Sequence, residues 1–292
     1  MNKKIGFIGI GIMGSPMCHH LMENGNELFI YTRTKEKAEM LIKEGATWLE
    51  SPAAVAEKSE IVFTIVGYPK DVEEVYLGEK GLIKGAKEGQ IFVDMTTTKP
   101  SLEIRIDKEL REKGATLVDA PVSGGEIGAI NGKLTIMTGG EEKDVKALEP
   151  LLKAMGTNIS YHGKVGSGQH AKMCNQIVIA GTMAGVSEAL VYGARAGLDL
   201  ETLVATISKG AAGCWTLDNL APKVINGNME PGFMVEHFIK DMKIALEEAD
   251  AMDLSLPSLA LTKELYTALK AQGYGRKGTQ ALVKALETLS GR

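Results

Sequence analysis

Near its N-terminus the chain reads Gly6-Phe7-Ile8-Gly9-Ile10-Gly11-Ile12-Met13-Gly14. A short apolar strand here runs into three glycines spaced G-x-G-x-x-G, and a helical stretch follows. In such a run the first glycine makes a tight turn, the second lets backbone approach a pyrophosphate, and the third lets helix pack on strand. The phosphates then lie at the helix N-terminus, where unpaired N–H groups favour negative charge. A glycine-rich turn without a ligand is the alternative, but the position after a strand favours a dinucleotide site made by Gly9, Gly11, Ile12, Met13 and Gly14.

The end of the second predicted strand bears on the choice of dinucleotide. Thr32-Arg33-Thr34 follows this strand, about twenty residues beyond Gly14. A site that prefers NAD usually has an acidic residue here for the ribose 2′-hydroxyl, but the nearest acid is Glu36, in the next helix. The guanidinium of Arg33, between two hydroxyls, suits a 2′-phosphate instead. We predict NADP as the preferred cofactor, with NAD as the alternative if Arg33 only stacks on adenine or faces solvent.

Strands and helices alternate through the first half of the chain. This alternation predicts a doubly wound α/β fold with a parallel sheet. The predicted helices include 35–44, 101–113 and 143–155. The strands are predicted at 5–8, 28–31, 61–66, 91–94, 116–119, 134–138 and 159–161.

The strand signal disappears after about residue 165. One long helix is predicted over 168–196, and the pattern stays helical to the end of the chain. Glycines cluster in 161–168, so we divide the chain into a dinucleotide-binding domain, 1–163, and a helical domain, 164–292. The pairs Ala180-Gly181 and Ala184-Gly185 repeat small residues four apart, a pattern that lets another helix approach closely.

The composition is typical of a soluble globular protein. The chain has 292 residues, 44% hydrophobic and 24% charged, a length that corresponds to about two domains. Lys and Arg number 33 against 37 Asp and Glu, and this net charge of −4 predicts no basic surface for nucleic acid. Three scattered cysteines are too few for a disulfide framework or a zinc site, so we expect a reducing compartment and no metal.

We expect neither a secretory signal nor a membrane span. The N-terminus enters a strand directly, without a long apolar region and a small-residue cleavage site. The longest apolar segment, 177–186, is about ten residues long, short of the ~20 needed to cross a bilayer. The sequence therefore predicts a cytoplasmic protein without a membrane partner.

A loop after the strand 116–119 is a candidate for binding a small carboxylate. It reads Asp119-Ala120-Pro121-Val122-Ser123-Gly124-Gly125 and should lie at the carboxyl edge of the sheet, where open α/β folds bind ligands. The hydroxyl of Ser123 and the amides of Gly124 and Gly125 can surround a carboxylate. An ordinary loop is the alternative.

The start of the long helix carries a second candidate segment. Helical spacing places Gly168, Lys172, Asn175 and Gln176 on one face. A lysine on an otherwise apolar helix is unusual, because an unpaired buried ammonium is costly. Lys172 is therefore a candidate for chemistry, with Asn175 able to bind what Lys172 contacts, although a structural lysine that pairs with a carboxylate is nearly as good an interpretation.

These segments, taken together, resemble the β-hydroxyacid dehydrogenases. This family contains 3-hydroxyisobutyrate dehydrogenase, tartronate semialdehyde reductase and the glyoxylate/succinic semialdehyde reductases. Four segments match in order over essentially the whole chain: the 6–14 fingerprint, the 119–125 loop, the 168–176 segment and Phe238-Ile239-Lys240-Asp241.

The resemblance implies a Rossmann domain, a long connecting helix and an all-helical second domain, assembled as a homodimer or homotetramer. It implies hydride transfer between a nicotinamide and a small semialdehyde, 2-oxo acid or β-hydroxy acid, with Lys172 as the catalytic acid/base. The substrate would be held by Ser123, Gly124, Gly125 and Asn175. The cofactor site would also be lined by Val66, Thr97 and Lys240.

The resemblance leaves the substrate and the strictness of cofactor choice open. In the glyoxylate/succinic semialdehyde branch the second strand ends in Asn-Arg-Thr and goes with NADP, whereas here Thr32-Arg33-Thr34 lacks the Asn. The segments 119–126 and 129–132 look closer to tartronate semialdehyde reductases. Glyoxylate, succinic semialdehyde, tartronate semialdehyde and 3-hydroxyisobutyrate are thus all candidates.

Three other classes of protein are alternatives to a β-hydroxyacid dehydrogenase. Imine reductases share the architecture but typically replace the catalytic lysine, and non-catalytic dinucleotide-binding modules on this fold tend to lose it, so Lys172 argues against both. A decarboxylating 6-phosphogluconate dehydrogenase generally has a much longer C-terminal part than this chain.

Overall fold

The computed structural model describes residues 3–291, which form two compact units. The first unit ends at Lys172 and the second begins at Met173, so the division falls inside helix α9 (Ser167–Arg195). The boundary expected after residue 163 lies in the loop just before this helix. Each unit is described below by itself.

The main sheet of the first unit is parallel and has six strands in the order β3-β2-β1-β4-β5-β6. Strand β1 pairs in parallel with both β2 and β4, so the chain reverses its direction of winding at β1. Open α/β sheets bind ligands at such a switch point, beyond the carboxyl ends of the strands. The doubly wound sheet predicted from the sequence is confirmed. Its strands are β1 (Lys4–Ile8), β2 (Glu27–Tyr31), β3 (Thr47–Trp48), β4 (Ile61–Thr64), β5 (Ile91–Asp94) and β6 (Thr116–Asp119).

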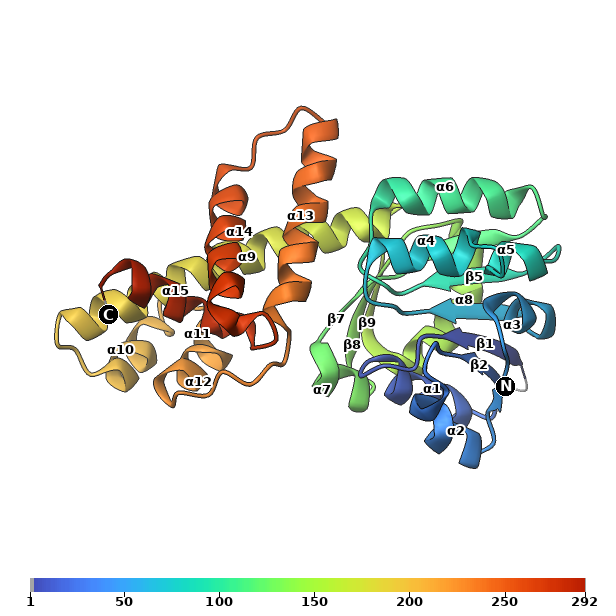
Figure 1. Cartoon of the computed structure of the whole chain (residues 1–292), viewed down its shortest axis with the longest axis horizontal. Coiled ribbons are helices and arrows are strands. Elements are labelled where there is room, and N and C mark those ends of the chain that lie inside the picture. Colours follow the sequence, from blue (N-terminus) through green and yellow to red (C-terminus); the bar gives the residue numbers. More distant parts are fainter. Residues whose placement is uncertain (1–2, 292) are drawn as a thin grey trace. The chain divides into compact units, whose positions relative to one another are not determined.

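Helices cover both faces of this sheet (Figure 1). Successive side chains of β1 point to opposite faces, so Phe7 packs in one core cluster and Ile8 in the other. Each fully buried side chain of this size contributes about 1.5–3 kcal/mol, which explains why the strands are apolar throughout. On the Phe7 face lie α1 (Gly14–Glu23), α2 (Glu39–Lys43) and α8 (Glu142–Met155). On the Ile8 face lie α3 (Pro52–Lys58), α4 (Pro69–Leu77), α5 (Leu82–Gly85) and α6 (Pro100–Arg111).

A second, three-stranded sheet follows β6. Strand β7 (Val122–Ser123) runs antiparallel to β8 (Leu134–Thr138), which runs parallel to β9 (Gly156–Tyr161), and α7 (Gly125–Ile130) joins β7 to β8. The predicted strands 134–138 and 159–161 therefore belong to this sheet and not to the main one. The chain leaves the main sheet at Pro121, which has no N–H for a sheet hydrogen bond, and a bridge from Asp119 to Gly139 links the sheets.

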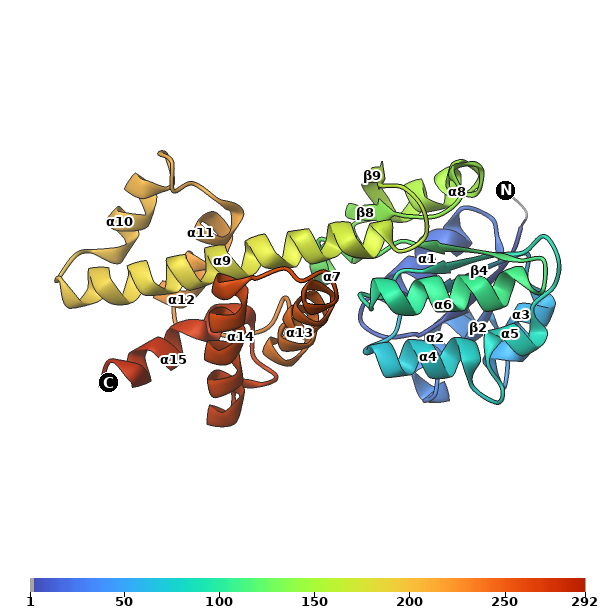
Figure 2. The same ribbon diagram turned by 90° about the horizontal axis from the view of Figure 1, so that it is seen from above.

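The second unit is helical, as predicted, and Figure 2 shows the long helix α9 with shorter helices beside it. Its main core contains Met183 of α9, Phe238 and Met242 of α13, and Tyr266 of α14. The helices after α9 are α10 (Leu200–Ile207), α11 (Trp215–Asn219), α12 (Ala221–Ile225), α13 (Val235–Ala251), α14 (Pro257–Leu269) and α15 (Leu282–Leu289), with short η2 (Lys270–Tyr274) and η3 (Thr279–Ala281) between the last two.

Helix α9 is longer and more apolar than the ten-residue segment considered from the sequence. It has 29 residues, and a window of mean hydropathy 1.5 makes it long and apolar enough to cross a bilayer by length and composition alone. The core helix of a soluble protein meets the same criteria, and Met173, Ala180 and Met183 of α9 are buried in the main core of the second unit. The absence of a membrane partner stays a prediction.

Candidate active site

The glycine turn between β1 and α1 has the geometry that a pyrophosphate requires. Gly9 has φ +101°, a region that side-chain-bearing residues rarely adopt. A Cβ at Gly14 would lie 1.9 Å from the carbonyl oxygen of Gly9, so this position also needs glycine. At Gly11, in contrast, a Cβ would meet no atom of the described chain within 4 Å. The open side of Gly11 is thus available for a ligand to approach the backbone.

The N-terminus of α1 also fits a phosphate. No side chain caps this end, its first turn holds no acidic residue, and the N-cap residue is Met13. The Ser15 N–H donates to the Gly11 carbonyl at 3.0 Å, which closes the turn, and the helix dipole favours an anion at this end. Ile12, whose side chain is 58% exposed, lies on the outer side of the turn.

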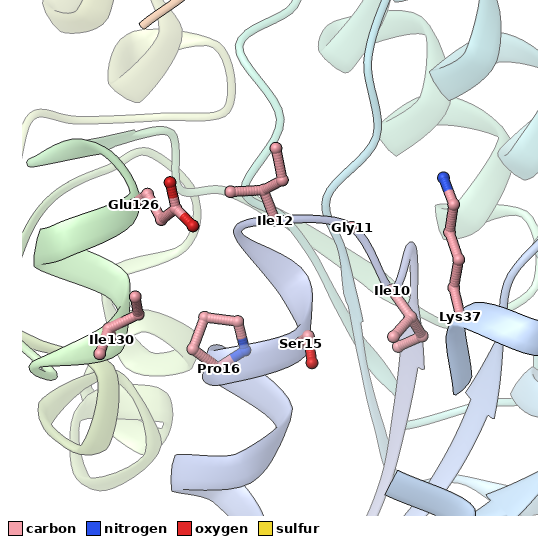
Figure 3. A pocket seen from close by; sticks show the side chains of 8 residues that line it. All are labelled: Ile10, Gly11, Ile12, Ser15, Pro16, Lys37, Glu126 and Ile130. Atoms are coloured by element: carbon pink, nitrogen blue, oxygen red, sulfur yellow. The ribbon is translucent and has the colours of Figure 1, made fainter. Parts of the chain in front are cut away.

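A cleft of about 430 Å³ opens beside this turn. Figure 3 shows Ile12 at the rim of the turn, Lys37 on one side, and Glu126 and Ile130 of α7 on the other. The volume falls in the range of ordinary small-molecule sites. The first unit thus offers an open turn, a helix N-terminus and an adjoining cleft, and together these fit a dinucleotide.

Three basic residues follow β2, and the structure holds each differently. Arg33 is exposed, and its Nη1 donates to Asp71 Oδ1 at 3.1 Å. The Nζ of Lys35 lies 4.4 Å from the centre of the Trp48 ring, so its charge is directed to that ring and not to the cleft. Lys37 lines the cleft. The sequence analysis did not include Lys37, and no helical spacing could have found it, because Arg33 lies before Thr34, the N-cap residue of the turn that carries Lys37.

The predicted helix 35–44 is two short pieces, a 3₁₀ turn (Lys35–Ala38) followed by α2. Thr34 is the N-cap residue of the 3₁₀ turn, and Thr32 precedes it at the end of β2. Because a 3₁₀ turn has three residues per turn, Lys35 and Lys37 point in different directions.

Val66 follows β4, which lies next to β1 in the sheet, and Thr97 follows β5, the next strand beyond β4. The backbone N–H of Val66 donates to Thr96 Oγ1 at 2.9 Å and ties the two loops together. Thr96 and Thr98 are buried, and Thr97 between them is partly exposed. The structure therefore brings Val66 and Thr97 to the same edge of the sheet as the glycine turn.

The loop Ser123-Gly124-Gly125 leads from β7 into α7. Gly124 has φ +126° and Gly125 has φ +61°, so both residues adopt backbone conformations that glycine reaches most easily. Successive amides in such conformations form a concave site for an anion. At the other end of α7, His20 Nε2 lies 3.0 Å from the carbonyl oxygens of Ala129 and Ile130, and this contact fixes α7 to α1.

Lys172 lies in the second turn of α9 and is buried, with 6% of the residue exposed. The carboxylate of Asp119, at the end of β6, accepts hydrogen bonds from the backbone N–H groups of Gly166 at 2.7 Å and Gln169 at 2.8 Å. Asp119 therefore holds the start of α9 against the carboxyl edge of the main sheet, one turn before Lys172.

A polar cluster of the second unit contains the other two predicted site residues. Asn175 Nδ2 donates to Gln176 Oε1 at 2.7 Å, and Gln176 Nε2 donates to Asp241 Oδ2 at 2.7 Å. Lys240 Nζ lies 3.0 Å from Asp241 Oδ1, so Asn175 and Lys240 are connected through Gln176 and Asp241. Asp241 was not predicted as a site residue, although it stands beside Lys240 in the motif that carried the resemblance.

His237 lies one turn before Lys240 on α13. Burial, and then the charge of Lys240, lower the pKa of His237 from its usual value. Within residues 3–291 no three His, Cys, Asp or Glu side chains gather as a metal site would require.

Comparisons with known proteins match both parts of the chain. Residues 4–163 match the family described as the NAD binding domain of 6-phosphogluconate dehydrogenase. Residues 166–286 match the family described as NAD-binding of NADP-dependent 3-hydroxyisobutyrate dehydrogenase.

Whole-chain relatives agree with these matches. The uncharacterized oxidoreductase YkwC of Bacillus subtilis is 52% identical over 284 residues, which cover 97% of this chain and 99% of the relative. The 2-hydroxy-3-oxopropionate reductase of Escherichia coli is 38% identical over 287 residues, which cover 98% of each chain.

Solved structures give the same result. A Mycobacterium tuberculosis 3-hydroxyisobutyrate dehydrogenase with L-serine has a TM-score of 0.89 and 26% identity, and the match covers 98% of this chain and 99% of that one. An imine reductase from Pseudomonas sp., with a TM-score of 0.64 and 18% identity, shares the fold alone. The chain therefore belongs to the 3-hydroxyisobutyrate dehydrogenase family and is an oxidoreductase that binds a pyridine nucleotide.

Proposed function

We propose that this enzyme reduces a small semialdehyde or 2-oxo acid with NADPH, and oxidises the matching hydroxy acid in reverse, with Lys172 as the general acid and base. The observation that carries the proposal is the burial of Lys172 in the second turn of a helix that Asp119 holds at the ligand-binding edge of the sheet. Burying an ammonium is costly unless it is paired and hydrogen-bonded, so a buried lysine at this edge of the sheet is a candidate for function.

The chain's own residues supply binding and proton transfer. The turn Gly9–Gly14 and the N-terminus of α1 hold the pyrophosphate, with Val66, Thr97 and Lys240 also lining the cofactor site. When bound, the nicotinamide supplies or accepts the hydride. Reduction builds negative charge on the carbonyl oxygen, and the ammonium of Lys172 donates a proton to that oxygen. In the oxidation the neutral amine of Lys172 takes the proton from the hydroxyl.

The substrate proposal requires a carboxylate beside the reacting oxygen. The Ser123 hydroxyl and the Gly124 and Gly125 amides, with positive φ at both glycines, are suited to hold this carboxylate. Asn175, one turn beyond Lys172 on α9, adds an amide that can bind the substrate. The E. coli relative is named for 2-hydroxy-3-oxopropionate, and the M. tuberculosis structure contains L-serine, which also carries a carboxylate and a β-oxygen. Tartronate semialdehyde, glyoxylate, succinic semialdehyde and 3-hydroxyisobutyrate form the test panel.

The preference for NADP rests on Arg33 and Lys37. Both are cationic, no acidic residue stands at the end of β2 for the ribose 2′-hydroxyl, and Thr32 and Thr34 add hydroxyl groups. The family description that matches residues 166–286 is also that of an NADP-dependent enzyme.

We further infer a homodimer or homotetramer, assembled in the cytoplasm. Helix α9 supports the assembly, because Val178 and Tyr192 are exposed and a Cβ at Gly181 or Gly185 would meet no atom of the described chain within 4 Å. This stripe of small and mostly apolar residues, which also contains Glu188, allows the close approach of a second copy. Cell fractionation checks the location.

The test of the reaction is Lys172→Met, with the exposed Lys164→Met as the matched control. We expect Lys172→Met to lose at least about a hundredfold in kcat with every carbonyl acid of the panel, as removal of a general acid does. NADPH affinity, measured by fluorescence titration, should stay within about twofold of wild type, because Lys172 acts on the oxygen of the substrate and not on the cofactor. Near-normal turnover by Lys172→Met would overturn the proposal, as would turnover of a cyclic imine or 6-phosphogluconate in place of the panel by the wild-type enzyme.

A further inference from the structure

A buried chain of polar side chains ties the first turn of α9 to the edge of the main sheet. It consists of Asp94 at the end of β5, Glu103 on α6, Asp119 at the end of β6 and Gln169 on α9. All four residues are fully buried and all belong to the first unit. None of them was predicted as a site residue.

Gln169 uses both ends of its side-chain amide. Its Oε1 accepts from the backbone N–H of Thr98 at 3.1 Å, and its Nε2 donates to the Thr96 carbonyl at 2.7 Å and to Glu103 Oε1 at 3.1 Å. Thr96 and Thr98 flank Thr97 in the loop after β5. Gln169 therefore connects the start of α9 to the loop that carries a predicted cofactor residue.

The same turn is held from the other side by Asp119, through its two backbone hydrogen bonds to Gly166 and Gln169. A Cβ at Gly168 would lie 2.4 Å from the carbonyl oxygen of Met137 and 2.8 Å from that of Asp119. The first turn of α9 is thus pressed against β6 and β8 and cannot shift without breaking these contacts. Lys172 follows Gln169 by three residues, so the two lie one turn apart on the same face.

Glu103 completes the chain as a buried acid. Burial, the charges of Asp94 and Asp119, and a hydrogen bond with the Asp94 carboxyl raise the pKa of Glu103 well above its usual value. A hydrogen bond between two carboxyl groups needs one proton on the pair, and Glu103 Oε1 accepts from Gln169 at 3.1 Å. Asp94 Oδ1 in turn accepts from the Thr96 N–H at 2.9 Å.

A contribution to stability alone does not explain why these carboxyl and amide side chains are buried here. Buried carboxyl groups lose their hydration, and well-packed apolar side chains of similar volume are often equally or more stabilising in their place. A polar network that joins several segments, in contrast, favours one arrangement of those segments. The network surrounds the turn that precedes Lys172, and a misplacement of about 1 Å at a reacting group can cost on the order of a hundredfold in rate.

We propose that Gln169 is a positioning residue for Lys172, and that Glu103 supports Gln169 as a proton donor to Asp94. This inference rests on the proposed role of Lys172 as the acid/base. It predicts that damage to the network lowers kcat of correctly folded enzyme, and does more than lower its stability.

The first test compares Gln169→Met, which keeps the length of the side chain but removes its three hydrogen bonds, with His170→Gln, an exposed position on the same turn. We measure kcat, KM for the best carbonyl acid and NADPH affinity well below the melting temperature, and express kcat per NADPH-binding site. Gln169→Met should lose about tenfold or more in kcat. Its KM for the carbonyl acid should stay within about threefold, because the residues proposed to hold the substrate are unchanged, whereas its NADPH affinity should fall, because Gln169 also holds the loop of Thr97. His170→Gln should match wild type.

The second test is a pair at Glu103, and it decides the question if Gln169→Met does not fold. Glu103→Gln keeps an acceptor for Gln169 and a donor for Asp94, so kcat should stay within about twofold of wild type. Glu103→Met removes both and should lower kcat about tenfold. A tenfold loss in Glu103→Gln would overturn the role of Glu103 as a neutral donor.

The outcomes separate this inference from the proposed function. If Lys172→Met keeps its turnover, the proposed function fails. If Lys172→Met is inactive but Gln169→Met and Glu103→Met lose only thermal stability and keep kcat, the positioning role fails while the function stands.

Discussion

The three basic side chains after β2 differ in how easily a phosphate could recruit them. Arg33 pairs with Asp71, but its side chain is 80% exposed, and exposed ion pairs contribute only about 0–1 kcal/mol. A 2′-phosphate could therefore take over the guanidinium at little cost. Lys35 is held over Trp48, whereas Lys37 already lines the cleft. Cofactor choice should thus depend on Arg33 and Lys37 and not on Lys35.

Arg33→Ala tests this view, with Lys35→Ala as a control of equal charge change. Hydrogen bonds to charged groups contribute about 1.5–3 kcal/mol, so Arg33→Ala should lower kcat/KM for NADPH by about ten- to a hundredfold. kcat/KM for NADH should change by less than about threefold, because NADH has no 2′-phosphate to lose the contact. Steady-state kinetics with both cofactors measure the effect. A similar loss with NADH, or an equal loss in Lys35→Ala, would contradict a 2′-phosphate site at Arg33.

At the scale of elements, the β1–α1 turn separates two roles of glycine. Gly14 is needed by the fold, since a Cβ there overlaps the carbonyl oxygen of Gly9. Gly11 has open space where a Cβ would go, so the fold does not require it. Its role, if the dinucleotide binds here, is to leave room for the pyrophosphate.

The pair Gly11→Ala and Gly14→Ala should therefore behave in opposite ways. We expect Gly11→Ala to melt close to wild type while its affinity for NADPH falls at least about tenfold, because the added methyl occupies the path of the pyrophosphate. Gly14→Ala should lose about 1–3 kcal/mol of unfolding free energy as the turn shifts to relieve the overlap. Thermal melts and NADPH titrations distinguish them. Unchanged NADPH affinity in Gly11→Ala would contradict the predicted binding site.

The elements that the sequence predicted are those with a long local signal. The strand 61–66 is a continuous apolar run, and β4 forms there because both faces of the sheet are covered. Strands β3 and β7 were missed because two residues carry no periodicity. They exist because β2 and β8 offer edges to pair with.

The residues of the candidate site also fall into those that a local sequence pattern reveals and those that only the fold brings together. The glycine turn and the Lys172 segment are local patterns and could be found by spacing. The network behind Lys172 could not, because the hydrogen bond from Gln169 to Glu103 joins residues 66 positions apart. Glu103 looks like any acidic residue of an amphipathic helix until the fold buries it.

For the whole molecule, the exposed face of α9 is the feature that bears on assembly. Exposed residues at spacings of three and four lie on one face of this helix: Cys174, Val178, Gly181, Gly185, Glu188 and Tyr192. The side chains of Val178 and Tyr192 are 65% and 76% exposed, and the two glycines between them leave room for another backbone. A second copy of the chain would cover this mostly apolar face, with Glu188 at hand for a polar contact, and bring the two helices close together.

Gly181→Arg tests the assembly without disturbing the single chain. A Cβ at Gly181 meets nothing within 4 Å, and replacing a helical glycine should, if anything, favour the helix by up to about 1 kcal/mol. Light scattering should give the mass of two or four chains of 31.2 kDa for the wild type, and a lower mass for Gly181→Arg, because a long charged side chain would have to be buried where the helices meet. Gly232→Arg, at another open glycine of the second unit, should keep the wild-type mass. A monomeric wild type would overturn the inferred oligomer, and an unchanged mass in Gly181→Arg would move its interface away from α9.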